Sequence, residues 1–185
     1  MKTLSNKDLK KLIEAIIFTS NKPVTIKELK FYFKDIETKD LRSVLKDLIA
    51  DWDNAEHGFN LVEVSNGYQL RTKPEYSDEI INFNKEIKKF RISKASLEVL
   101  AITAYKQPLT RLEIEQIRGV DCSGVLNQLL DKRLMEIRGR KEVPGKPFLY
   151  GTTDEFLETF NLKSIKDLPT LQEIEDMEPE LKLDF

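Results

Sequence analysis

The sequence is poor in the residues from which disulfides, metal sites and catalytic sites are usually built. It has one cysteine, one histidine and one tryptophan in 185 residues. The single Cys122 excludes a disulfide within the chain, and no cysteines and histidines cluster at metal-ligand spacing. No phosphate-binding glycine loop is present, and no nucleophile stands beside a base. We therefore expect a non-enzymatic protein without a cofactor or a bound metal, in a reducing compartment.

Long apolar runs and an excess of one charge are also missing. The start of the chain, MKTLSNKDLKKLIEAIIF, carries too many charges for a signal peptide, and no stretch approaches a membrane span. We therefore expect a cytoplasmic protein that makes no membrane contact. Lysine and arginine number 30 against 32 acidic residues, for a net charge of -2. A protein that depends on phosphate contacts is usually basic, so this balance disfavours a function based on DNA binding alone.

Two stretches of the sequence repeat each other at an offset of 85 residues. Residues 13–29 (IEAIIFTSNKPVTIKEL) align with residues 98–114 (EVLAITAYKQPLTRLEI). The alignment superimposes three residues of each copy: Pro23 on Pro108, Thr25 on Thr110 and Glu28 on Glu113. A Thr-x-x-Glu capping box after a helix-breaking proline predicts that a second helix begins at the same place in both copies.

Each copy continues with a third helical stripe and two strands, which is the element order of a winged helix-turn-helix domain. We therefore predict an α+β, mainly helical fold of two tandem winged helix-turn-helix domains joined by a short linker. The amino-terminal domain is expected at residues 1–85 and the carboxy-terminal domain at residues 91–168. Residues 169–185 form an acidic tail that we expect to be disordered.

The hairpin expected at residues 59–72 has a regular alternation of apolar residues. A three-residue loop at residues 65–67 would pair Val64 with Tyr68 and place the apolar side chains on one face. We therefore predict this register, with Gly67 in the left-handed conformation.

The second hairpin has a longer and more basic connection, RGRKEVPGK, between strands expected at residues 134–137 and 148–150. Gly145 beside Pro144 predicts a tight turn. Arginine can contact a partner or brace a loop against its own carbonyls, and the ordering cost of a long basic loop favours a partner. Upstream, Arg118-Gly119 is explained equally well by a partner contact and by a helix end. The candidate partner-binding residues are Arg118, Arg138, Arg140, Lys141 and Lys146.

Three further sets of residues were weighed as candidates. Cys122 is expected near a helix start, where a thiol can have a lowered pKa, but a small packing residue is the favoured interpretation. His57 is expected to be solvated. The amino-terminal domain has more apolar residues than a small core holds, and aromatic residues concentrate in stable interfaces. The candidate dimer-interface residues are Phe31, Tyr32, Phe33 and Phe59.

Two segments of the carboxy-terminal half carry a specific resemblance. The stretch YKQPLTRLEIEQIRGVDCSGVLNQLL, followed by GRKEVPGKPFLYGTT, closely resembles the bacterial segregation and condensation protein B (ScpB) family. The first half agrees through EAIIF, NKPVTIKEL and LVEVSNGYQLRTKPEY, so that the resemblance covers roughly residues 12–168. The sequence departs from the family at Cys122, where a small or polar residue is usual, and at Lys146, where arginine is common.

The resemblance implies a non-enzymatic subunit of the SMC condensin-like complex, which supports chromosome condensation and segregation during cell division. Such a subunit is a homodimer that binds the kleisin ScpA, reaches SMC through ScpA, and is associated with the nucleoid through that complex. In this family the amino-terminal domains usually form the dimer. The carboxy-terminal domain is then expected to bind the kleisin.

The rival interpretation is a tandem winged-helix transcription regulator, in which the third helix of a domain enters the DNA major groove. In the amino-terminal domain, basic residues of that helix alternate with acidic ones: Lys39, Arg42 and Lys46 with Asp40, Asp47 and Asp51. Acidic groups repel phosphate, so strong independent DNA binding is not expected. Any DNA contact through the basic wing is expected to be weak.

Overall fold

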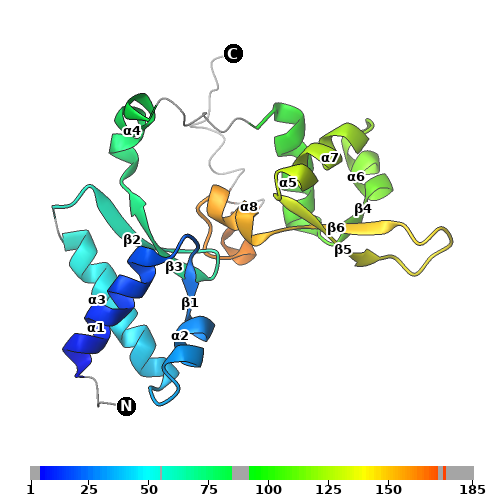
Figure 1. The fold of residues 1–185 in the computed structure, drawn as a ribbon. Coiled ribbons are helices and arrows are strands. Elements are labelled where there is room, and N and C mark those ends of the chain that lie inside the picture. Colours follow the sequence, from blue (N-terminus) through cyan, green and yellow to red (C-terminus); the bar gives the residue numbers. More distant parts are fainter. Residues whose placement is uncertain (1–4, 55, 85–91, 171–172, 174–185) are drawn as a thin grey trace. The chain divides into compact units, whose positions relative to one another are not determined.

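The computed structural model describes residues 5–54, 56–84, 92–170 and 173 (Figure 1). The chain divides into two compact units, Met1–Ile92 and Ser93–Phe185, called unit one and unit two below. Each unit combines helices with a three-stranded antiparallel sheet, which confirms the predicted mixture of helix and sheet. The predicted linker and most of the predicted acidic tail lie outside the described residues.

Unit one places three helices before a hairpin. The helices are α1 (Asn6–Thr19), α2 (Ile26–Tyr32) and α3 (Thr38–Asn54), with the short strand β1 (Val24–Thr25) between the first two. The hairpin strands are β2 (Phe59–Val64) and β3 (Gly67–Thr72), followed by η1 (Pro74–Tyr76) and α4 (Ser77–Phe83). Strand β1 pairs with β3, so the strand order is β1-β3-β2.

Unit two repeats this order. Its elements are α5 (Lys94–Lys106), β4 (Leu109–Thr110), α6 (Arg111–Arg118), α7 (Ser123–Asp131), β5 (Met135–Arg140) and β6 (Phe148–Thr152). The strand order β4-β6-β5 matches that of unit one. The unit ends with α8 (Asp154–Thr159) and η2 (Ile165–Asp167). The repeat in the sequence is therefore also a repeat in the structure.

The predicted capping boxes set the start of the second helix in each unit. In unit one, Thr25 N donates to Glu28 Oε2 at 2.8 Å, and Glu28 N donates to Thr25 Oγ1 at 3.2 Å. In unit two the equivalent distances between Thr110 and Glu113 are 2.7 and 3.3 Å. Both boxes are confirmed. Each is worth about 1 kcal/mol of helix stability and fixes the residue at which a strand turns into a helix.

Each unit has its own apolar core beneath its sheet and helices. In unit one, the largest fully buried side chains come from all three helices and from the end of β2: Ile13, Leu29, Leu41, Leu45, Leu48 and Val64. In unit two they come from the equivalent helices and from the start of the hairpin: Leu100, Ile114, Leu126, Leu129, Leu134 and Met135. The buried residues follow helical spacing, so burial rather than intrinsic propensity stabilises these short helices.

The register predicted for the first hairpin is wrong. Val64 pairs with Gly67 and Glu63 with Tyr68, which leaves a two-residue loop of Ser65 and Asn66. Both loop residues have positive φ, 50° and 56°, as tight hairpin loops require. Asparagine tolerates this conformation better than most residues, so no glycine is needed in the loop.

Gly67 serves a different purpose, which is the close approach of β1 to β3. It is paired with Thr25. A Cβ atom at residue 67 would lie 3.0 Å from the backbone carbons of Pro23 and Val24. Such a contact is tighter than nine in ten of those that real Cβ atoms make, and two of its partners are backbone atoms that cannot rotate away.

We expect Gly67→Ala to destabilise unit one by about 1–3 kcal/mol, because the added methyl group must push β1 away from β3. Chemical denaturation followed by circular dichroism measures this change. The matched control is Gly124→Ala in α7, where no atom lies within 4 Å of the added Cβ. The control should be neutral or stabilising by up to about 1 kcal/mol. Equal stability of the two variants would contradict this role of Gly67.

Candidate partner-binding surfaces

The basic loop of unit two is anchored to the start of α6. Lys141 Nζ lies 2.6 Å from Glu113 Oε1. The other oxygen of this carboxylate accepts hydrogen bonds from the backbone N–H and the hydroxyl of Thr110, each at 2.7 Å. The hydrogen bond from Lys141, followed by those from Thr110, lowers the pKa of Glu113 to about 2. One carboxylate thus caps a helix and holds the basic loop between β5 and β6.

The basic residues beside Lys141 are also held within the unit. The guanidinium of Arg140 lies 4.0 Å from the ring centroid of Phe148, and its Nη1 donates to the Lys146 carbonyl at 3.0 Å. Arg138 Nη2 donates to the Thr152 carbonyl at 2.6 Å. A Cβ on Gly151 would collide with the side chain of Arg138, so this glycine makes room for the arginine.

The strands of the second hairpin are longer than predicted, because β5 continues to Arg140 and β6 to Thr152. Arg138 and Arg140 therefore belong to a strand and not to a loop. The loop itself contains the predicted tight turn: Lys146 N donates to the Val143 carbonyl at 2.9 Å, and Gly145 has a φ of 87°. Of the four basic candidates, Lys146 is the most loosely held, with Nζ 3.6 Å from Glu142. The intramolecular contacts of the other three favour the bracing interpretation over the partner interpretation.

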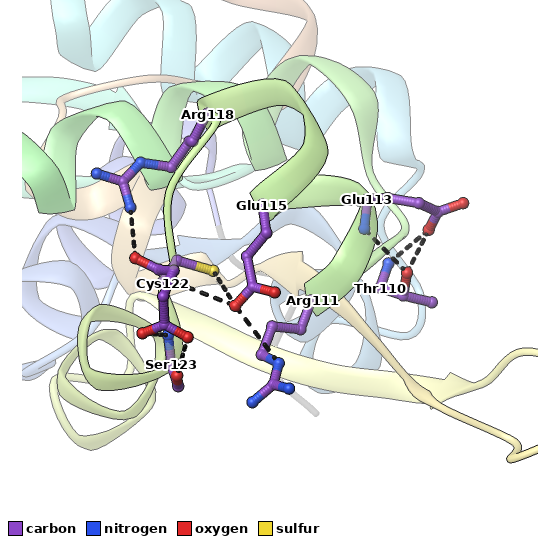
Figure 2. Close-up of polar contacts among 8 residues, drawn as sticks. Thr110, Arg111, Glu113, Glu115, Arg118, Cys122 and Ser123 are labelled. Atoms are coloured by element: carbon purple, nitrogen blue, oxygen red, sulfur yellow. Dashed lines mark hydrogen bonds and ion pairs between the residues drawn. The ribbon is translucent and has the colours of Figure 1, made fainter.

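Arg118 is part of the packing at the end of α6 (Figure 2). Its side chain is only 7% exposed and forms an ion pair with Glu98 of α5 at 3.1 Å. Its Nη1 donates to the Asp121 carbonyl at 3.3 Å. Gly119 follows in the left-handed conformation that ends the helix. We therefore assign Arg118 to the joint between α5, α6 and the following loop, and remove it from the candidate partner surface.

Cys122 is a buried packing residue, and a lowered thiol pKa is excluded. Burial, followed by the nearby Glu115 carboxylate, raises the pKa of the thiol to about 11. Figure 2 shows Glu115 of α6 reaching towards the start of α7, where its Oε1 accepts from Cys122 N at 3.2 Å. The same oxygen lies 3.5 Å from Arg111 Nε. Glu115 therefore ties α6 to α7.

The residues of α6 that face solvent include apolar ones that sequence reasoning did not single out. Leu112 is 60% exposed, and Ile117 and Val120 are also exposed. Val120 lies just after the end of α6, and for brevity we call these three the α6 apolar residues. With 3.6 residues per turn, Leu112 points away from the buried Ile114, two positions later. The sequence does contain a signal for this surface. Leu112 lies within the Thr110–Glu113 capping box, on a side of the helix other than that of the buried Ile114.

Two of the four aromatic candidates of unit one are available to a partner. Phe31 and Tyr32, at the end of α2, are 78% and 61% exposed. Phe33 is 3% exposed and lies in the core of unit one, so it is removed from the candidate interface. Its ring meets that of Tyr32 edge-on, with centroids 4.9 Å apart. Phe59 is half-buried and contacts Trp52 and His57.

Exposed aromatic side chains that the sequence analysis did not list include Phe18 in α1 and Phe83 at the end of α4. Phe18 directly follows the buried Ile17, so it falls outside the apolar stripe of α1. Within the described part of the chain, no group of three or more potential ligands is arranged to hold a metal ion. None of the described helices combines the length and the apolar character needed to cross a membrane.

The sequence profile described as segregation and condensation complex subunit ScpB matches residues 11–171. A segregation and condensation protein B of Syntrophotalea carbinolica is 45% identical over 173 residues, covering 94% of this chain and 87% of that protein. The same-named protein of Clostridioides difficile is 37% identical, covering 94% of this chain and 98% of that protein. A crystal structure of ScpB from Mycobacterium tuberculosis is 25% identical, with 86% of this chain and 98% of that chain covered and a TM-score of 0.41.

We expect Lys141→Met to raise the pKa of Glu113, because the largest cause of its lowering is removed. Carbon-detected NMR titration of the Glu113 carboxyl measures this directly. A lowered carboxyl pKa contributes stability above the ordinary value of 4.5, and this contribution is lost as the pH falls towards 2. The variant should therefore lose less than about 1 kcal/mol at neutral pH, and the difference should vanish in strong acid.

The control for this experiment is Lys146→Met, which makes the same charge change in the same loop. Lys146 pairs with Glu142 and not with Glu113, so the titration of Glu113 should stay close to that of the unmodified protein. An unchanged pKa of Glu113 in Lys141→Met would show that Lys141 does not hold the capping carboxylate in solution.

Proposed function

The chain belongs to the segregation and condensation protein B family, and we propose that it is a non-enzymatic subunit of an SMC condensin-like complex. The observation that carries the proposal is the extent of the match, which spans residues 11–171 and therefore both units. In this role the protein supports chromosome condensation and segregation, in the cytoplasm and in association with the nucleoid.

Each unit is a winged helix in this proposal. The support is the shared element order: three helices, a short strand after the first of them, and a hairpin that pairs with this strand. The two hairpins are the wings. Residues 1–85 then form the dimerisation domain and residues 91–168 the kleisin-binding domain.

Unit one forms a homodimer through the exposed aromatic residues of α2. Phe31 and Tyr32 are adjacent, and both leave most of their surface in water. Burying an aromatic side chain removes roughly 150–250 Å² from water, so two such residues on each protomer give an interface a strong apolar centre. Phe33, packed beneath Tyr32, holds this ring from the core side.

Unit two binds the kleisin ScpA, the partner that the sequence resemblance implies, and reaches SMC through it. The α6 apolar residues are the proposed contact. Alternation of exposed apolar residues with polar ones such as Arg111 and Gln116 suits a groove or helix of a partner with an apolar stripe. Lys146 remains exposed at the tip of the wing and is the proposed place of any weak DNA contact.

We expect Leu112→Asp to weaken binding of ScpA at least tenfold, because a buried carboxylate without a partner opposes association. Co-purification of the full chain with the ScpA of the same organism, followed by calorimetry, measures the loss. Phe83→Asp is the control, since Phe83 is also apolar and is even more exposed, at 92%, but lies in unit one. Full retention of ScpA by Leu112→Asp would remove α6 from the interface. Tight, sequence-dependent DNA binding in the absence of ScpA would instead favour a transcription regulator.

We expect the double variant Phe31→Ser and Tyr32→Ser to sediment as a monomer at concentrations where the unmodified chain is a dimer. The reason is that both rings lose their apolar surface without disturbing the core, which contains Phe33 and not these two. Analytical ultracentrifugation measures the dissociation constant. Phe83→Ser, which removes an exposed ring elsewhere in unit one, should leave the dimer intact. A dimer that survives the double variant would place the interface on another face.

A further inference from the structure

Unit one contains a cavity that the proposed assembly does not use. Its volume is about 460 Å³, within the range of small-ligand sites. It lies where the first half of α1 meets the end of α3 and the residues leading to β2. Its lining consists of Lys7, Lys10, Lys11, Glu14, Leu48, Asp51, Trp52 and His57.

One wall of the cavity is aromatic. The rings of Trp52 and His57 have centroids 4.9 Å apart, and His57 stacks on Phe59 with an interplanar angle of 16° at 5.8 Å. Trp52 also contacts Phe59 at 4.8 Å. Phe59 thus supports both rings from behind, while His57 stays exposed. Trp52 is tilted by 50° to His57, so a planar ring can stack on one of the two rings at a time.

The part of the lining that α1 contributes is mainly basic. Lys7 and Lys11 are four residues apart on α1, so they lie one above the other on the same side of the helix. Among the described residues, neither is paired with a carboxylate. Lys10, in contrast, is held by Asp51 of α3 at 2.6 Å, and this ion pair joins the two helices at the cavity. Glu14 is the second acidic residue of the lining, one turn beyond Lys10 and Lys11.

An aromatic surface that shares a cavity with two ammonium groups left unpaired by the described carboxylates matches one common ligand chemistry, a planar heterocycle that carries phosphate. We propose that this cavity binds a nucleoside phosphate, with the base stacked on one ring of the Trp52–His57 pair and the phosphate between Lys7 and Lys11. The ligand is a free nucleotide or one nucleotide of single-stranded DNA, since both present the same base and phosphate. The proposal is independent of the contacts with ScpA and of the dimer.

Trp52 is the only tryptophan of the chain, so its fluorescence reports on this cavity alone. The test is titration of the full chain with thymidine monophosphate, thymidine, inorganic phosphate and a short oligothymidylate, with excitation at the red edge of the tryptophan band. We expect saturable quenching by the monophosphate and by the oligonucleotide, and weaker binding at higher salt. Thymidine and phosphate, which each offer half of the ligand, should bind at least about tenfold more weakly. Tighter binding of the oligonucleotide than of the monophosphate assigns the site to single-stranded DNA, and equal binding assigns it to free nucleotides.

The double variant Lys7→Gln and Lys11→Gln should weaken binding of the monophosphate by about five- to tenfold, through loss of two exposed charge contacts. The matched control is Lys39→Gln and Lys46→Gln, which makes the same charge change at exposed positions of α3 outside the lining. Thermal melting verifies that both variants fold. Absence of saturable quenching by the monophosphate overturns the proposal. Equal affinity of the two double variants, or thymidine binding as tightly as its monophosphate, overturns the role of the lysines.

Discussion

The Thr-x-x-Glu capping box is the local interaction on which both units depend. In each unit it stands where a two-residue strand ends and the second helix begins, so one glutamate decides the angle between the sheet and that helix. Hydrogen bonds from Thr25 lower the pKa of Glu28, as those from Thr110 do for Glu113. In unit two, Lys141 also contacts this carboxylate, so the loop between β5 and β6 is attached to the helix cap. A local motif has in this way acquired a long-range partner.

The parts of the fold that could be predicted are those that local chemistry determines. The capping boxes, the helical stripes and the turn at Gly145 each rest on residues close together in the sequence. The register of the first hairpin could not be found in this way. It depends on the approach of β1 to Gly67, a contact between segments more than 40 residues apart. The alternation of apolar residues favoured the longer loop, and the pairing of β3 with both β1 and β2 shows the shorter one.

The contacts that basic residues make within their own unit could not be predicted, for a related reason. A sequence shows where Arg118, Arg140 and Lys141 lie along the chain, but not which acceptors the fold brings to them. Glu98 reaches Arg118 from another helix, and Glu113 reaches Lys141 from 28 residues away. A basic stretch in a chain with slightly more acidic than basic residues therefore has many partners within its own fold. The α6 apolar residues were not predicted to be exposed, because apolar residues at helical spacing were all assigned to the core.

Residues at equivalent positions of the repeat behave alike at the end of the second helix of each unit. At an offset of 85 residues, Phe33 corresponds to Arg118 and Tyr32 to Ile117. Phe33 and the side chain of Arg118 are both turned inward, whereas Tyr32 and Ile117 are both exposed. The same helix end in each unit thus has one residue that anchors it and a neighbour that faces solvent. The inward-facing position has a buried ring in unit one and a paired guanidinium in unit two. Because the two side chains differ in chemistry, we attribute their common inward direction to the backbone geometry that the two copies share. The exposed neighbour is free of that constraint, and it is aromatic in unit one and aliphatic in unit two.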